Sequence, residues 1–283
     1  QGSDITFKNI TIDNNAAQPE INKMAVEWFE NHLAASLTEI EDCFDKYRLS
    51  EALMSTYKLV WDDFCSWYLE IIKPVYQQPI DGATYEATLA IFEKLMCMLH
   101  PFMPFITEEI WHILRERNAE ESIMVAQMPK SAEYNNDLLQ RFAVAKETII
   151  GLRRLRNSKD MSPKEVLKLY IKKSADNTQF DDMIAKLCNL SKIEYVAEKI
   201  ENSLSFMVGT VECFVPFSQN IDKDAELKKL EEELTYTQGF LQSVMKKLSN
   251  ERFVNGAPEK VVAIERQKHA DAEQKIKALE EQI

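Results

Sequence analysis

The chain has 283 residues, 45% of them hydrophobic, and a formal net charge of -12. A chain of this size can bury a sizeable core and is expected to divide into two or three units rather than one. It has no apolar run long enough to span a bilayer, and its start has neither the basic residues nor the apolar stretch of a secretory signal. The composition therefore predicts a soluble, cytoplasmic protein.

The acidic charge is concentrated in the first half of the chain. Residues 1–135 carry 10 Lys and Arg against 22 Asp and Glu, whereas residues 136–283 carry 24 of each. Within residues 146–173, nine basic residues stand against three acidic ones, centred on GLRRLRN at residues 151–157. Such a basic cluster is equally typical of a solvated helix face and of an RNA contact.

The first 135 residues are predicted to form a helical bundle, because apolar residues recur there at steps of three and four. One helix begins near Pro19, and a second runs from about Leu49 until Pro74 ends it. Residues 75–82 are expected to form a loop, and residues 84–99 a third helix.

Two prolines interrupt the bundle after its third helix. Pro101 and Pro104 lack a backbone donor, so the chain must break before a further helix begins at Thr107. We expect Phe102 and Phe105 to pack inward at this break. Removing the Phe105 ring would then cost about 3–5 kcal/mol of stability.

The middle of the chain changes its period and is predicted to be a small α+β unit. Apolar and polar residues alternate over three segments, as in strands with one solvated face. The expected elements are an extended exit at 121–129, a helix at 137–157, a strand at 167–171, a helix at 180–188, and strands at 204–208 and 211–217.

The last segment carries a heptad pattern. Leucines recur every seven residues in its first half, and a turn and a second seven-residue series follow. The first series is Leu227, Leu234, Leu241 and Leu248, with Leu230, Thr237 and Val244 beside it; the second is Val262, His269, Ile276 and Ile283, with Ala272 and Leu279. The two helices, each roughly 40 Å long, can pair antiparallel. The fold class is therefore mainly α, with a helical bundle over residues 1–135, a small α+β connector over 136–220 and an antiparallel coiled-coil hairpin over 221–283.

No catalytic or metal-site pattern is present in the sequence. It has no glycine-rich phosphate loop, nucleophile elbow or HExxH motif. The five cysteines and four histidines are scattered, and the cysteines are expected to be buried free thiols. We therefore expect no catalytic residue, no metal and no cofactor in this chain.

An aromatic group in the second predicted helix has two interpretations. Trp61, Phe64, Trp67 and Tyr68 follow helical spacing and are expected to be mostly core. Unpaired RNA bases are commonly read by stacking on such rings. Tyr57, Lys58 and Trp61 are the residues expected near an exposed edge. The acidic pair Asp62 and Asp63 is expected to serve solubility or a first-turn dipole role.

Several stretches resemble a known family. KYRLSEAL at 46–53, WDDFCSWYLE at 61–70 and LHPFMPFITEEIW at 99–111 resemble the anticodon-binding bundle of class I aminoacyl-tRNA synthetases for branched aliphatic amino acids. IIGLRRLR at 149–156 is similar to the basic helix that follows this bundle, with departures at Gly151 and Asp160. LSNERFVNGAPEKVV at 248–262 resembles the C-terminal arm of valine-tRNA ligases.

The resemblance implies a tRNA-binding piece of a larger ligase. The catalytic HIGH and KMSKS signatures and the editing domain are absent, so we expect a truncated, non-catalytic chain whose parent uses ATP to attach valine to tRNA-Val. The implied tRNA contacts are Arg48, Tyr57, Lys58 and Trp61 on the bundle, Arg153, Arg154, Arg156 and Lys159 on the basic helix, and Lys246, Lys247, Arg252, Lys260, Arg266 and Lys268 on the arm.

Two alternatives remain open from the sequence. An isoleucine-specific relative would share the bundle but is expected to end in a cysteine-rich zinc module instead of a heptad hairpin. A non-RNA adaptor could instead use the leucine seam to join other coiled coils, as the overall acidity permits. We expect a monomer, with association through the arm as the open alternative.

Overall fold

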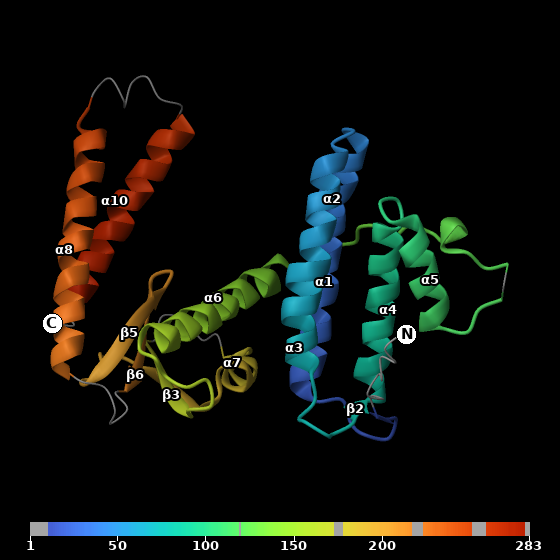
Figure 1. The fold of residues 1–283 in the computed structure, drawn as a ribbon, viewed down its shortest axis with the longest axis horizontal. Helices are drawn as coiled ribbons and strands as arrows, with labels where there is room; N and C mark the ends of the chain where they lie inside the picture. Colours follow the sequence, from blue (N-terminus) through green and yellow to red (C-terminus); the bar gives the residue numbers. More distant parts are fainter. Residues whose placement is uncertain (1–10, 119, 173–177, 217–222, 251–258, 281–283) are drawn as a thin grey trace, which may run out of the picture. The chain divides into compact units, whose positions relative to one another are not determined.

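A computed structural model describes residues 11–118, 120–172, 178–216, 223–250 and 259–280, and its mainly helical fold confirms the predicted class (Figure 1). The side chains of residues 223–229, 233, 259 and 260 are outside this description. The chain forms two compact units. The first comprises residues 1–154, 163–166 and 175–191, and the second residues 155–162, 167–174 and 192–283.

The first unit is built around a long helix, α1 (Glu20–Asp45). The predicted second helix is one helical run of three parts, α2 (Leu49–Lys58), the π-helix η1 (Leu59–Tyr68) and α3 (Leu69–Ile72), and it ends before Pro74 as expected. These elements pack on α1, and on α4 (Gly82–Leu99), mainly through aromatic rings. The rings of Phe29, Phe64 and Tyr68 lie within 5.6 Å of a neighbouring ring centroid.

A short parallel strand pair precedes α4. β1 (Ile12–Asp13) pairs with β2 (Ile80–Asp81), so the end of the predicted 75–82 loop is a strand instead. Two residues are too few to show the period-two alternation by which strands are recognised. Asp81 also caps α4, because its carboxylate accepts from the Thr84 N–H at 2.8 Å.

The helix after the two prolines, α5 (Pro104–Leu114), is placed differently from the prediction. Pro104 occupies the first turn, as prolines favour. Phe102 is half-buried and its ring stacks on that of Phe44 at 6.1 Å, but the Phe105 side chain is 91% exposed. The prediction that Phe105 packs inward is therefore wrong. The side of α5 that carries Thr107 faces the bundle, and Phe105 lies away from it.

The first unit also contains a 3₁₀ turn, most of one long helix and one short helix. η2 (Ile123–Val125) is a 3₁₀ turn within the predicted extended exit, and α6 (Asn136–Ser158) and α7 (Asp181–Cys188) match predicted helices. α6 joins the bundle through Phe142, whose ring stacks on Trp28 with centroids 3.7 Å apart. α7 packs on α3, where the Lys186 ammonium donates to two carbonyls. Helices on both sides of the predicted border at 135 thus pack together.

The second unit contains a four-stranded sheet in the order β4-β3-β6-β5. The strands are β3 (Leu167–Lys172), β4 (Leu190–Val196), β5 (Ser203–Val208) and β6 (Val211–Pro216), and β6 is antiparallel to both β3 and β5. β3, β5 and β6 were predicted. β4 was missed because this edge strand has no buried residue and therefore lacks a clear alternation.

The arm is a pair of helices that lie side by side, α8 (Lys223–Leu248) and α10 (Glu259–Glu280) (Figure 1). Val244 and Thr237 are buried between them, while Leu234, Leu241 and Leu248 are half-buried. On α10, the buried side chains are those of Val262, Glu265, Ala272 and Leu279. The predicted antiparallel pairing is confirmed for the described residues, since the end of α8 contacts the start of α10 through Lys247 and Glu265. Leu227 and Ile283 lie outside the described side chains.

Candidate nucleic-acid interfaces

The bundle presents two stacked aromatic rings to solvent. Tyr57 at the end of α2 and Trp61 in η1 are one helical turn apart, and their ring centroids are 6.4 Å apart with planes inclined by 13°. The Tyr57 side chain is 52% exposed and that of Trp61 59%, whereas Trp67 and Tyr68 are buried. The predicted division of this aromatic group is therefore confirmed. The two exposed rings can accept a further flat group on their open faces.

A cleft of about 370 Å³, lined in part by Tyr57, lies between α1 and the α2–η1 run. Its lining is mixed, with polar, acidic, basic and apolar side chains. The residues are His32, Ser36, Glu39, Met54, Ser55, Tyr57, Lys58, Leu59, Asp62 and Asp63. Lys58 is exposed and lines this cleft together with Tyr57, so the cleft carries a cation. An aromatic platform with an adjacent cation suits a base and its phosphate.

Arg48 is held in the turn between α1 and α2. Its guanidinium donates to Asp42 at 2.6 Å and to Glu51 at 2.9 Å. These acids already balance its charge, and they fix the turn in which Tyr47 has a positive φ of 56°. Arg48 therefore stabilises this end of the bundle, and its predicted RNA contact stays a prediction.

A buried carboxylate fastens α6 to the bundle. Asp63 lies 2.9 Å from the His32 ring nitrogen Nε2 and accepts from the Lys146 ammonium at 3.2 Å. The same ammonium lies over the Trp67 ring, 4.9 Å from its centroid. Burial acts to raise the pKa of Asp63, but the hydrogen bond and charge of His32, followed by those of Lys146, outweigh it and lower this pKa. The solubility role expected for Asp63 is wrong, since its side chain is 8% exposed.

The basic helix divides into exposed and buried arginines. Arg153 and Arg154 are exposed, and the Arg153 guanidinium lies 5.8 Å from the Trp67 centroid. Lys159 is half-buried. Arg156 is 4% exposed and donates to the Ser162 carbonyl at 2.8 Å. Its placement contradicts the expectation that it contacts RNA, because a buried guanidinium that holds a loop is not presented to phosphates.

The end of α6 explains one departure from the family pattern. Asp160 has φ of 50°, the left-handed conformation that often closes a helix. The Met161 N–H then donates back to the Arg156 carbonyl at 2.9 Å, and the Asp160 N–H to the Asn157 carbonyl at 3.4 Å. Asp is among the few residues other than glycine that visit this conformation. Asp160 therefore terminates the helix rather than interrupting it.

The arm carries exposed cations around one buried acid. Lys246 and Arg266 are exposed, and so are Lys247 and Lys268. The last two approach the Glu265 carboxylate at 3.8 and 2.7 Å. The hydrogen bond from Lys268 lowers the Glu265 pKa, although burial opposes it. Arg252 lies outside the described residues, as does the side chain of Lys260.

Sequence reasoning missed Asp63 and Glu265 as organisers of these surfaces. Glu265 lies seven residues before Ala272 and fourteen before Leu279, so the buried row of α10 includes an acid that the heptad pattern had left out. This spacing was the only feature of the sequence that could have indicated the buried position of Glu265. Asp63 was missed because it was interpreted together with the adjacent Asp62, although only Asp63 points inward.

The sequence of this chain matches two known domain families. The family of the anticodon-binding domain of tRNA ligase matches residues 26–171, just over half of the chain, so the chain belongs to this family. The valyl tRNA synthetase tRNA binding arm matches residues 222–283. The second match favours valine over the isoleucine alternative.

Three relatives are valine–tRNA ligases of bacteria. The chain is 52% identical to that of Parabacteroides distasonis over 276 residues, which are 98% of this chain and 32% of the relative. It is 48% identical to that of Christiangramia forsetii over 96% of this chain and 31% of the relative, and 52% identical to that of Phocaeicola vulgatus over 94% and 30%. The chain therefore spans about a third of the length of these relatives. Among the described residues, no helix is long and apolar enough to cross a membrane.

Proposed function

We propose that this chain is the tRNA-binding portion of a cytoplasmic valine–tRNA ligase, and that it recognises tRNA-Val while other parts of a longer polypeptide use ATP and carry out catalysis and editing. The two domain matches and the 52% identity to valine–tRNA ligase support this proposal. The observation that carries it at the level of side chains is the exposed, stacked pair of Tyr57 and Trp61 in the anticodon-binding domain.

The bundle acts on the anticodon loop. Bases in an RNA loop can be unstacked from one another and stacked on aromatic side chains, so Tyr57 and Trp61 offer them a platform. Each stacked base contributes about 1–3 kcal/mol. Lys58, Arg153 and Arg154 supply cations for the backbone phosphates, whose neutralisation releases counterions. Phosphate contacts position the RNA, and base contacts give the sequence preference.

The arm acts on a separate part of the tRNA. Its exposed Lys246, Lys247, Arg266 and Lys268 form a basic surface on a narrow helical pair, which suits contact with the outer corner of the molecule. The rest of the chain is acidic, with a net charge of -12 over the whole sequence. This acidity limits nonspecific binding, so that affinity depends on engaging both basic surfaces at once.

The test is binding of a valine anticodon stem-loop to Trp61→Ala and Tyr57→Ala variants. Since one stacked base contributes about 1–3 kcal/mol, each variant should raise the Kd by about 5- to 150-fold. Tyr134→Ala is the matched control, because that ring is also exposed, at 42%, but is not part of the stacked pair. Melting temperatures should stay unchanged in all three variants. Equal stem-loop affinity in Trp61→Ala, Tyr57→Ala and the unaltered protein would refute the stacking role.

A further inference from the structure

The buried row of the arm contains a charged side chain. Among the described residues of α8 and α10, Glu265 is the only charged residue that is buried. It follows the heptad pattern of Val262, Ala272 and Leu279, at a position where an apolar residue packs well. Replacing a buried ion pair by apolar residues is often neutral or stabilising, so stability does not explain this carboxylate. Its contacts indicate what it does instead.

Two lysines on different helices contact the Glu265 carboxylate. The Lys268 ammonium, one turn further along α10, donates to Oε1 at 2.7 Å. The Lys247 ammonium, near the end of α8, lies 3.8 Å from Oε2. Oε2 is buried and accepts no hydrogen bond from the described residues, so the Lys247 ammonium is the cation that compensates its charge. A buried acid therefore holds one cation from each helix of the arm.

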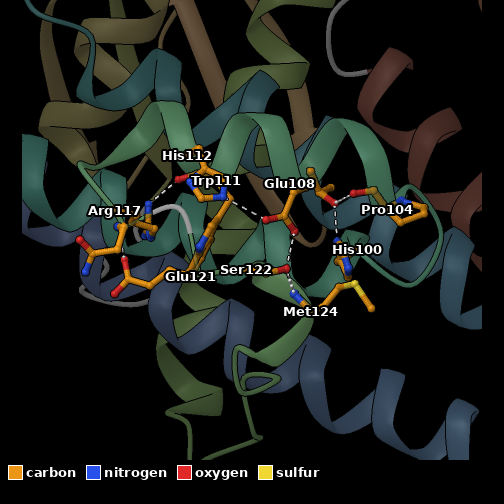
Figure 2. A network of polar contacts seen from close by, with 11 residues as sticks. His100, Pro104, Glu108, Trp111, His112, Arg117, Glu121, Ser122 and Met124 are labelled. Atoms are coloured by element: carbon orange, nitrogen blue, oxygen red, sulfur yellow. Dashed lines mark hydrogen bonds and ion pairs between the residues drawn. The ribbon is translucent and has the colours of Figure 1, made fainter.

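An acid of the first unit also binds two cations, but for the fold. Glu93 on α4 binds Arg115 and Arg117, which follow α5. Arg117 is 11% exposed, donates to the Trp111 carbonyl and places its guanidinium 3.9 Å from the Trp111 ring centroid (Figure 2). Because these contacts are internal, this guanidinium fastens one element to another and presents little charge to a ligand.

The cluster on the arm has the reverse arrangement. Its acid is buried, whereas the Lys247 side chain is 59% exposed and that of Lys268 46%. An ammonium has three donors, and the hydrogen bond to Glu265 engages one of those of Lys268. The remaining donors of both lysines can bind a ligand that approaches from solvent. Two cations against one acid leave a net positive charge there.

We propose that Glu265 is a positioning residue for tRNA, which holds Lys247 and Lys268 together as a site for backbone phosphate; this inference rests on the proposed function of the arm. Lysine binds phosphate as a point charge. A free lysine side chain loses rotamer freedom when it binds a ligand, and this loss opposes binding. Lysines that a buried acid already holds have lost part of that freedom before tRNA arrives, so their phosphate contacts are stronger.

Specification of the helix pair is the competing role for a buried charge in a coiled coil. That role requires contacts between helices, but the shorter contact of Glu265 is with Lys268 on its own helix. A contact within α10 adds nothing to the pairing of α10 with α8. It does hold a second exposed cation on the carboxylate that Lys247 approaches. The contacts therefore favour phosphate positioning.

The experiment replaces Glu265 by Leu and by Gln in the 283-residue chain. Both variants remove the negative charge; Glu265→Leu also makes the buried row apolar, and Glu265→Gln keeps the shape of the side chain. Affinities are measured for a tRNA-Val transcript and for its anticodon stem-loop, and melting temperatures by circular dichroism. Glu273→Gln is the matched control, because Glu273 also lies on α10 but is 58% exposed and contacts His269 at 3.3 Å.

Charge and positioning predict opposite changes in affinity. Removing an acid from a basic surface should strengthen RNA binding if charge alone acted. Loss of positioning should instead weaken binding of intact tRNA-Val about fivefold in both Glu265 variants, the low end for two side chains that must be ordered on binding. Stem-loop affinity and the Glu273→Gln variant should show no loss, and Glu265→Leu should melt at the same or a higher temperature.

A double-mutant cycle identifies the two lysines as the groups that Glu265 positions. In a chain that carries Lys247→Met and Lys268→Met, Glu265→Leu should have no further effect on the affinity for intact tRNA-Val, because no positioned ammonium remains. A fivefold loss that persisted in this background would contradict the proposal, since Glu265 would then act through other residues.

Three further outcomes would overturn the proposal. Unchanged or tighter binding of tRNA-Val by Glu265→Gln would leave Glu265 without a positioning role. Weaker binding accompanied by a lower melting temperature in both variants would make Glu265 a part of the fold. A dimer of Glu265→Leu in light scattering, with unchanged affinity, would assign the acid to specification of the helix pair. Absence of tRNA binding by the unaltered chain would instead defeat the proposed function.

Discussion

Replacing Asp63 by Asn tests whether a buried carboxylate holds the basic helix on the bundle. Asp63 binds His32 at 2.9 Å and Lys146 at 3.2 Å, and hydrogen bonds to charged groups contribute about 1.5–3 kcal/mol each. Breaking a fully buried pair costs about 3–5 kcal/mol. His32 and Lys146 both keep 29% exposure and can rehydrate, so the expected loss is lower, about 2 kcal/mol.

Urea unfolding at pH 7 measures this loss, with Asp62→Asn as the matched control. Asp62 is exposed and adjacent, so its substitution should change stability by less than about 0.5 kcal/mol. In a double-mutant cycle, Lys146→Met should lose much of its own effect in the Asp63→Asn background, because contacting residues couple. Equal stabilities of the Asp62→Asn and Asp63→Asn variants would refute the anchoring role.

The pH dependence of the same variants has a definite sign. The pKa of Asp63 is lowered in the folded protein from its ordinary value of 3.8, so its charged form stabilises the fold above pH 3.8. This contribution is lost as pH falls through the lowered pKa. The stability difference between the unaltered protein and Asp63→Asn should therefore be constant at neutral pH and narrow below pH 3.8.

The division of the arginines and the exposure of Phe105 lead to further predictions. Arg153→Gln with Arg154→Gln should weaken tRNA binding and reduce the salt slope by about two units, since two phosphate contacts are lost; unchanged affinity would contradict their role. Arg156→Gln should instead lower the melting temperature, because its contact with Ser162 is internal. Phe105→Ala should cost less than about 0.5 kcal/mol in denaturant titration, and Phe29→Ala, at 0% exposure, about 3–5 kcal/mol.

The elements that could be predicted from sequence are those with a long, regular pattern. The helices of the bundle, α6 and the arm each bury one face, so their period is visible in the chain. β1, β2 and β4 were not predicted, because two-residue strands and an edge strand with no buried residue show no alternation of apolar and polar residues. The π-helical form of η1 was also missed, since its residues have an ordinary helical pattern.

Side-chain roles were harder to predict than elements, because residue type does not specify orientation. Arg156 belongs to a basic run with Arg153 and Arg154, yet it alone turns inward to hold the loop after α6. Phe105 lies in an apolar motif, yet its side chain is on the side of α5 away from the buried Thr107. By contrast, the exposure of Tyr57 and Trp61 was predicted correctly from their place at the edge of the aromatic group.

The central claim is that the chain grips tRNA at two separate places, and removal of residues 222–283 tests it most directly. The arm shares the second unit with the sheet, but its two helices pack chiefly on each other, so the bundle of the first unit should keep its cooperative unfolding transition. Binding of intact tRNA-Val and of its isolated anticodon stem-loop is then measured at low and moderate salt. Truncation should lower the affinity for intact tRNA by about tenfold or more and leave the stem-loop affinity unchanged, because the stem-loop cannot reach the arm. Equal affinity of the whole and truncated chains for intact tRNA would contradict a second tRNA contact on the arm and would leave protein association as the purpose of the arm.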